Sequence, residues 1–181
     1  MILVRIDRIK GDVRIEGYKD WFIADSIDFG VGRKVEVVDT SGKDIEEGKV
    51  EEQELSISKS VDVASVYLMH AAMKGRTEVA SSRPVSVDIH LAQIMQSNAS
   101  SSRSVQAYLK IRIENAIITN WDIEASGDER PSESIKLWFN RAAMKYRASA
   151  DGKVFETHGP LGWDQQENKD WKPDVLLKND D

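Results

Sequence analysis

Hydrophobic and polar residues alternate along much of this chain, which is the two-residue period of a β-strand with one buried face. Ile2, Val4 and Ile6 share one parity near the start, and Lys10-Gly11-Asp12 follows as a turn. The same alternation returns with apolar positions at Val85, Val87, Ile89 and Leu91, then at Leu109, Ile111 and Ile113, then at Ile135, Leu137 and Phe139. Turns and polar loops separate these segments, so the pattern predicts antiparallel strands.

A second extended segment is expected at 18–32, and Gly30 and Gly32 close it. In the later strands the alternation changes phase at two places, Ile117-Ile118 and near Ala142-Ala143. An extra residue in one strand changes the phase in this way. We therefore expect a bend or β-bulge at both later places, the second of them inside one strand that covers 134–148.

One segment, about 62–75, has the period of a helix. Asp62 can cap its first turn, and Lys74 and Gly75 suit its last turn and its end. The apolar stripe that we expect to pack on the sheet lies at positions i, i+3, i+4, i+7 and i+10, namely Val63, Val66, Tyr67, His70 and Met73. On this pattern His70 is a core or interface histidine.

The stretch 33–54 has no long apolar period and contains Gly42 and Gly48, so we expect an extended loop there. Loops of this length in compact domains are usually functional or disordered. Residues 39–54 hold seven acids and two lysines, a local charge of −5. This loop could contact a partner, but it lacks the residue order of an EF-hand calcium site.

These elements predict a mainly β fold, an antiparallel β-barrel or sandwich with one α-helix packed alongside. With 181 residues the chain fits one domain, which we place at 1–170, followed by a polar C-terminal tail at 171–181.

Composition removes several classes of function. The chain has no cysteine, which excludes a disulfide framework and a cysteine-based zinc site or nucleophile. Its net charge of −6 argues against general binding of nucleic acid, which needs clustered Lys and Arg. Neither a long apolar run nor a basic-then-apolar leader stands at the start, so we expect no membrane anchor and no signal peptide.

A possible nucleophile motif, S-x-x-K, occurs at Ser56 to Lys59. Leu55, Ile57 and Val61 alternate with serines around it, which is the pattern of a strand. On a strand, side chains three residues apart point to opposite faces and lie about 10 Å apart along the axis. Ser56 and Lys59 could not exchange a proton in that geometry, and a Ser-Lys hydrolase is only the minor alternative.

The other candidate sites are weak. His70, His90 and His158 lack metal-site spacing, and Asp88 with His90 has no third ligand. The five tryptophans are not matched by a basic groove and are better explained by core and interface packing. The residues therefore predict no catalytic set, no metal and no cofactor, which favours a binding or structural protein.

Three blocks of the chain resemble one family. They are the strand and helix at 55–76 (L-S-I-S-K-x-V-D, ending K-G), Y-L-K-I-x-I-E at 108–114, and Gly162-Trp163-Asp164 with Asn168-Lys169. Together with strands in matching order over about 1–170, they are similar to haemolysin-coregulated (Hcp) proteins, the tail-tube subunits of bacterial type VI secretion systems.

The resemblance implies a tail-tube-like barrel of two curved sheets, six copies of which close into a ring. Stacked rings would form a tube that is tipped by a spike protein, driven by a contractile sheath and able to carry small effector proteins. The protein would be assembled in the bacterial cytoplasm and then secreted or delivered to target cells. Alternatives are a tube subunit of a phage tail or a related contractile particle, and a monomeric barrel that binds a small ligand.

Residue roles follow from this implied assembly. Asp44, Glu46, Glu47 and Lys49 are predicted to contact the adjacent ring or subunit. Ser26 and Asp28 have the parity opposite to Ile27 and Phe29, so they are predicted to face the channel and touch cargo.

Overall fold

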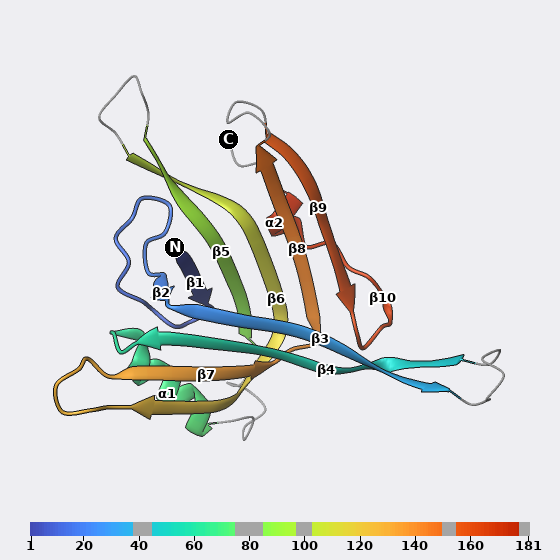
Figure 1. Ribbon diagram of the computed structural model, residues 1–181, viewed down its shortest axis with the longest axis horizontal. Helices are drawn as coiled ribbons and strands as arrows, with labels where there is room; N and C mark the ends of the chain where they lie inside the picture. The colour runs from blue at the N-terminus through green and yellow to red at the C-terminus, as the bar shows by residue number, and fades with distance from the viewer. Residues whose placement is uncertain (38–44, 75–84, 97–102, 150–154, 178–181) are drawn as a thin grey trace.

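The computed structural model describes residues 1–37, 45–74, 85–96, 103–149 and 155–177, and it shows a mainly β architecture with two helices in these ranges (Figure 1). The strands are β1 (Ile2–Ile6), β2 (Phe22–Ala24), β3 (Ser26–Val37), β4 (Ile45–Ser60), β5 (Val85–Gln96), β6 (Arg103–Glu124), β7 (Ser132–Trp138), β8 (Arg141–Ser149), β9 (Phe155–Asp164) and β10 (Lys169–Asp170). The helices are α1 (Ala64–Lys74) and the short α2 (Asp174–Leu177).

The strands form two layers that share β6, and every pairing is antiparallel. Sheet A has the order β10-β9-β8-β6-β5-β1-β2, and sheet B has the order β3-β4-β7-β6. β6 passes from one sheet to the other at Asn115, whose φ is 55°. Its register against β7 shifts between Ile118 and Asn120, which confirms the irregularity predicted at Ile117-Ile118.

The chain passes from sheet B back to sheet A at Phe139-Asn140, between β7 and β8. The strand expected at 134–148 is therefore two strands, with β7 in sheet B and β8 in sheet A. The bulge predicted near Ala142-Ala143 is wrong, because β8 pairs with β6 in continuous register from Arg141 to Tyr146; the register shift against β9, between Met144 and Tyr146, has its extra residue in β9.

The expected closed barrel is wrong. The described strands form an open sheet path, in which β8 and β9 stand apart from sheet B (Figure 1). β6 carries sheet A away from sheet B at its bend, and no described strand bridges β9 and β3.

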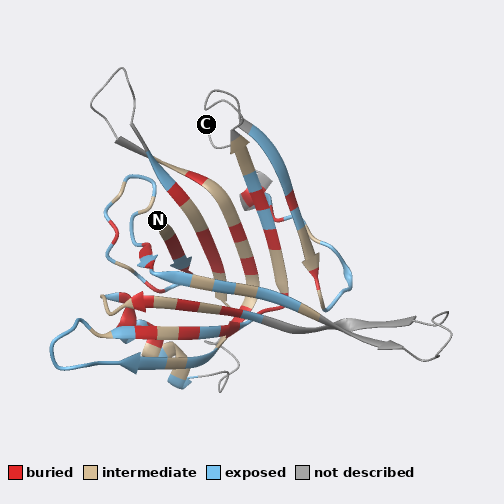
Figure 2. Ribbon diagram, in the orientation of Figure 1, coloured by how far each residue is buried: buried red, intermediate tan, exposed pale blue. Residues whose placement is uncertain are grey.

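The core lies between the two sheets and α1. Its fully buried residues include Ile57 of β4, Ile113 of β6 and Leu137 of β7. Alternate residues of β7 and of β4 from Glu54 to Ser60 are buried, as Figure 2 shows, and this is the observed form of the predicted alternation.

α1 confirms the predicted helix but presents the opposite face. Ala64 and Leu68 are buried and Ala71 packs against the core, whereas the bulky stripe predicted to pack is exposed. The start of the helix explains the orientation: Ala64 N donates to Asp62 Oδ1 (2.7 Å), and Asp62 N donates to Ser65 Oγ (2.9 Å). Ser65 Oγ also donates to Glu133 Oε1 of β7 (2.7 Å), which holds this side of the helix against sheet B.

Lys59 is the cation at the centre of this junction. It is fully buried, and its Nζ lies 2.6 Å from Glu133 Oε1 and 2.8 Å from both Asp62 Oδ1 and the carbonyl oxygen of Ser60. Trp121 Nε1 of β6 donates to the other oxygen of Glu133 (2.7 Å). This set of hydrogen bonds ties β4, β6, β7 and α1 together.

A second buried charge organises the turn after β9. Asp164 accepts hydrogen bonds from Arg141, from the backbone N–H of Glu167 (3.0 Å) and from Asn140 (3.2 Å). Burial works against its charged form, but these hydrogen bonds and the charge of Arg141 outweigh that effect and lower the pKa of Asp164. Asn168 closes the same turn with a φ of 50°. The Gly-Trp-Asp and Asn-Lys block thus has a structural role here.

The C-terminal segment 171–181, expected to be a polar tail, is held against the domain in its described part. Trp171 N donates to the carbonyl oxygen of Gly162 (2.9 Å), and Leu176 of α2 is buried.

We predict that Lys59→Met lowers the free energy of unfolding by about 3–5 kcal/mol, because Glu133 and Asp62 lose a buried cation. Lys136→Met is the matched control, since it breaks the exposed Lys136–Glu54 pair (3.1 Å) and is expected to cost less than about 1 kcal/mol. Urea unfolding of both variants measures the difference. Equal costs would show that the buried pair is not a stabilising contact.

We predict that Asp164→Asn destabilises the protein at neutral pH and much less in acid. The folded pKa of Asp164 is below the ordinary unfolded value of about 3.9, so its contribution is complete above that value and disappears as the pH falls through the folded pKa. Urea midpoints between pH 7 and pH 2 measure this, with Asp128→Asn at an exposed turn as control. A loss in stability that does not change with pH would contradict the prediction.

Candidate functional site

The outward face of sheet B, over β3, β4, β7 and β6, is mostly polar and also carries Trp138 and Ile117. Paired residues on this face form three rows: Ser26, Ser58, Ser134 and Asp122; Asp28, Ser56, Lys136 and Asn120; and Gly30, Glu54, Trp138 and Ile117. We call these three rows the polar face. The residues between them, Leu55, Ile57, Ile135 and Leu137 among them, point into the core and are buried.

The structure brings Ser26 and Asp28 together on the polar face, where both are exposed, with Ile27 and Phe29 packed against the core behind them. Ser26 pairs with Ser58, and Asp28 pairs with Ser56. The predicted difference in parity is therefore confirmed. That this face lines a channel stays a prediction.

The polar face carries three acids and one base. Lys136 lies 3.1 Å from Glu54, whereas Asp28 and Asp122 sit among hydroxyl and amide side chains. Trp138 adds one aromatic ring, 40% exposed, beside Glu54 in the register. The face can therefore offer hydrogen bonds and a weak negative field to a polar surface.

Sequence reasoning missed most of the polar face. Ser56, Ser58, Ser134, Lys136, Asn120 and Asp122 each lie opposite in parity to a core residue of the same strand, a signal that was available. What the sequence does not reveal is the register that lines these residues up in rows, because β4 and β7 are more than 70 residues apart in the chain.

The segment expected as a loop at 33–54 is largely strand. β3 continues to Val37 and β4 begins at Ile45, so the two form a long hairpin arm that projects past the rest of the molecule (Figure 1). Only β3 pairs with β4 before Glu54, so this part of the ribbon lacks the alternation that marks a half-buried strand.

The predicted contact residues belong to this arm. Glu46 pairs with Glu36 and Glu47 pairs with Val35, while Lys49 lies where the register of the arm shifts. Asp44 lies outside the described residues. The acids of the arm therefore sit on an extended ribbon rather than on an irregular loop.

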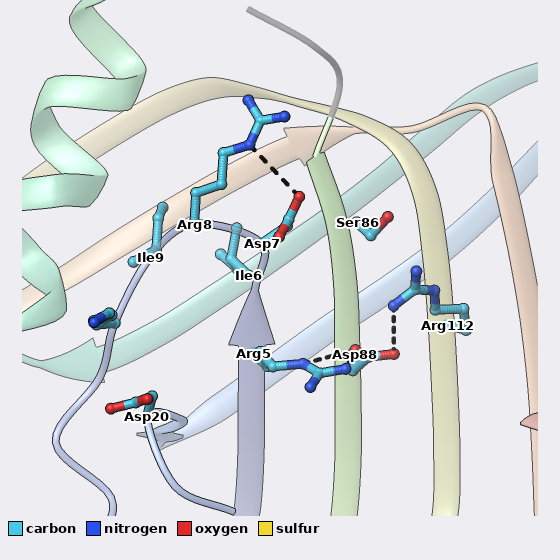
Figure 3. A pocket seen from close by; sticks show the side chains of 10 residues that line it. Arg5, Ile6, Asp7, Arg8, Ile9, Asp20, Ser86, Asp88 and Arg112 are labelled. Carbon is cyan, nitrogen blue, oxygen red and sulfur yellow. Dashed lines mark hydrogen bonds and ion pairs between the residues drawn. The ribbon is translucent and has the colours of Figure 1, made fainter. Parts of the chain in front are cut away.

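A second polar region is a cavity of about 480 Å³ beside the ends of β1 and β5, shown in Figure 3. Asp88 is its buried centre, and it accepts hydrogen bonds from Arg5 Nη2 (2.6 Å) and Arg112 Nη1 (2.8 Å). Burial disfavours the charge of Arg112, but hydrogen bonds and charge from Asp88 and Glu114 outweigh this and raise its pKa. Because Arg5 and Arg112 both direct their guanidinium groups at Asp88, and Arg112 also pairs with Glu114 (3.1 Å), the cavity is better explained as a structural ion-pair network than as an anion site.

The weak candidates from the sequence do not gather into a site. Lys59 is buried with Glu133, while Ser56 lies on the polar face, so the Ser-Lys pair is separated as predicted. His90 Nδ1 lies 3.2 Å from Tyr18 Oη, whereas Asp88 is bonded to Arg5 and Arg112, so the two do not form a pair of metal ligands. His70 is exposed rather than in the core. In the described ranges no group of three metal-binding side chains occurs.

Neither described helix has the length and apolar character needed to cross a membrane.

Comparison with known proteins identifies the family. The family model described as type VI secretion system effector, Hcp, matches residues 3–146. Comparison with curated protein sequences gives no significant match.

Solved structures show the same fold at low sequence identity. A structure described as a type six secretion system protein superposes with a TM-score of 0.76 at 18% identity, covering 94% of this chain and 98% of that one. Hcp1 from Salmonella typhimurium gives a TM-score of 0.63 at 18% identity, with 94% and 97% covered. A type VI secretion system effector from Yersinia pestis gives 0.58 at 17% identity, with 91% and 99% covered. The family match extends over most of the chain, and the protein therefore belongs to the Hcp family of type VI secretion proteins.

Proposed function

We propose that this protein is a tail-tube subunit, six copies of which close into a ring whose stacked rings form a conduit for small effector proteins. The open path of its sheets carries the proposal. In the described residues β3 pairs with β4 alone along its whole length, and β9 pairs only with β8 except where the two-residue β10 joins it at Trp163 and Asp164. Long edges of this kind invite pairing or covering by another chain. Edges at two different places suit a head-to-tail ring rather than a two-fold dimer.

Membership of the Hcp family also supports the proposal of a tail-tube subunit. The conduit would be tipped by a spike protein and driven by a contractile sheath, and the protein itself would be secreted or delivered with its cargo. A tube subunit of a phage tail or another contractile particle would have the same architecture, and neighbouring genes would distinguish it from a secretion-system tube.

Within this tube the polar face would line the channel. Its serine hydroxyls, amides and unneutralised acids, Asp28 and Asp122, form a hydrated wall that contains one exposed tryptophan. Such a wall suits transport, since weak polar contacts hold a folded cargo without trapping it. The hairpin arm would contact the adjacent ring through its acids, so stacking would depend on salt.

Sedimentation velocity and negative-stain microscopy of the purified protein test the assembly. We expect a particle of six subunits with a central opening. A monomer at all accessible concentrations would overturn the tube proposal and favour a monomeric ligand-binding domain.

We predict that deletion of residues 40–50 leaves rings intact and prevents stacking. The deletion removes the end of the hairpin arm but keeps the ladder from Ser26–Ser58 to Gly32–Glu52, so the subunit should still fold. Stack length in micrographs, under conditions in which the unmodified protein stacks, is the measurement. Stacks of unchanged length would rule out the arm as the ring-to-ring contact.

We predict that Asp28→Ala weakens cargo retention without loss of the ring, because it removes an exposed carboxylate from the polar face. Glu129→Ala, at an exposed position in the connection between β6 and β7 and outside the three rows, is the control. Co-purification of a co-produced small effector measures retention. Equal retention by the variant and the unmodified protein would remove Asp28 from the cargo surface.

A further inference from the structure

Two apolar surfaces are left uncovered by the chain itself. The first lies on α1 and on Val63, the residue before it, and comprises the stripe that the sequence placed in the core. We call it the helix ridge: Val63, Val66, Tyr67, His70 and Met73. Its four apolar side chains are 52–77% exposed, a high value for four large groups so close together in the chain.

The second surface is on β8 and β9, and it continues the core face of sheet A. Met144 pairs with Ile111, which is only 3% exposed, so the two side chains share a face. Tyr146 lies two residues farther along β8 and Leu161 pairs with Met144, so both share it too. Yet Met144, Tyr146 and Leu161 are 48%, 42% and 71% exposed. We call these three residues the sheet strip.

The sheet strip is uncovered because sheet B ends before it. Sheet B and α1 cover the core face of sheet A over β5 and β6, but β8 and β9 extend beyond them (Figures 1 and 2). α1 packs beside the part of β6 that belongs to sheet B, on the other side of the molecule. The helix ridge of a subunit therefore cannot cover its own sheet strip.

The charges that border the two surfaces are complementary. Glu156 pairs with Ala148, two residues beyond Tyr146 on the same face of β8, and its side chain is 80% exposed. The helix ridge ends at Lys74, the basic residue of the last turn of α1. An acid therefore borders the sheet strip, and a base borders the helix ridge.

We propose that the helix ridge of one subunit packs on the sheet strip of the next copy of this chain, with Lys74 directed toward Glu156. This inference rests on the proposed ring and names the residues of its subunit contact. Both surfaces are apolar, their borders are opposite in charge, and they differ from each other. Repetition of such a head-to-tail contact gives a ring when its rotation closes, as the proposed ring of six requires, whereas a self-complementary patch would stop at a dimer.

The contact also explains the residues that α1 uses. Ala64, Leu68 and Ala71 face the subunit's own core, and the two alanines let the helix lie close to it, while Val66, Tyr67 and Met73 face outward.

Two single variants, Val66→Asp and Leu161→Asp, test the contact by complementation. Each puts a carboxylate into one surface and leaves the other intact. Each alone is expected to sediment as a monomer. A 1:1 mixture is expected to give a dimer of one copy of each, because the intact ridge of the Leu161→Asp chain meets the intact strip of the Val66→Asp chain. Both positions are exposed, so circular dichroism and thermal unfolding should show a folded protein.

Ile23→Asp on β2 is the matched control, because Ile23 is 48% exposed and belongs to neither surface. It should keep the ring. If both test variants still form rings, or if their mixture stays monomeric, the pairing of ridge and strip is wrong while the tube proposal stands. If the unmodified protein forms no ring, the tube proposal itself fails.

A covalent test uses the absence of cysteine in the chain. The double variant Val66→Cys with Leu161→Cys is expected to give a ladder of disulfide-linked species up to six subunits under mild oxidation. Val66→Cys with Ile23→Cys should give none. A ring without the ladder would overturn the proposed contact.

Discussion

The buried pair of Lys59 and Glu133 is the interaction on which the rest of this structure depends. Lys59 has no exposed surface, and removing a charge from water is costly unless partners surround it. Glu133, Asp62 and the Ser60 carbonyl supply those partners, and Ser65 and Trp121 use the remaining capacity of Glu133. Because Lys59 lies on β4, Glu133 on β7, Trp121 on β6 and Ser65 on α1, these hydrogen bonds and ion pairs set how the four elements meet.

The orientation of α1 is one consequence. Asp62 contacts both Lys59 and the first N–H of the helix, and Ser65 reaches Glu133. These two anchors leave little freedom for the helix to turn about its axis. Ala64 and Leu68 consequently face the core, and the bulky stripe faces outward, although it has more apolar surface to bury.

The second constraint is the long strand β6, which belongs to both sheets. Its bend at Asn115 and the crossing at Phe139-Asn140 send β8 and β9 away from sheet B, so the barrel stays open. An isolated domain with an uncovered core face and two long edges exposes surface that is unfavourable in water. The same features are what a ring subunit requires, since its neighbours would cover them.

The sequence by itself determined the existence of the helix, the strands that alternate clearly and which residues of those strands point inward, because these depend on the local periods of 2 and 3.6 residues. Leu55, Ile57, Ile135 and Leu137 were recognisable as core, and Ser26 and Asp28 as their opposite face. The tertiary structure alone decided the register that aligns the polar face, the side of α1 that is buried, and the open path of the sheets. These depend on contacts between residues far apart in the chain, above all Lys59 with Glu133, and no local pattern encodes such a contact.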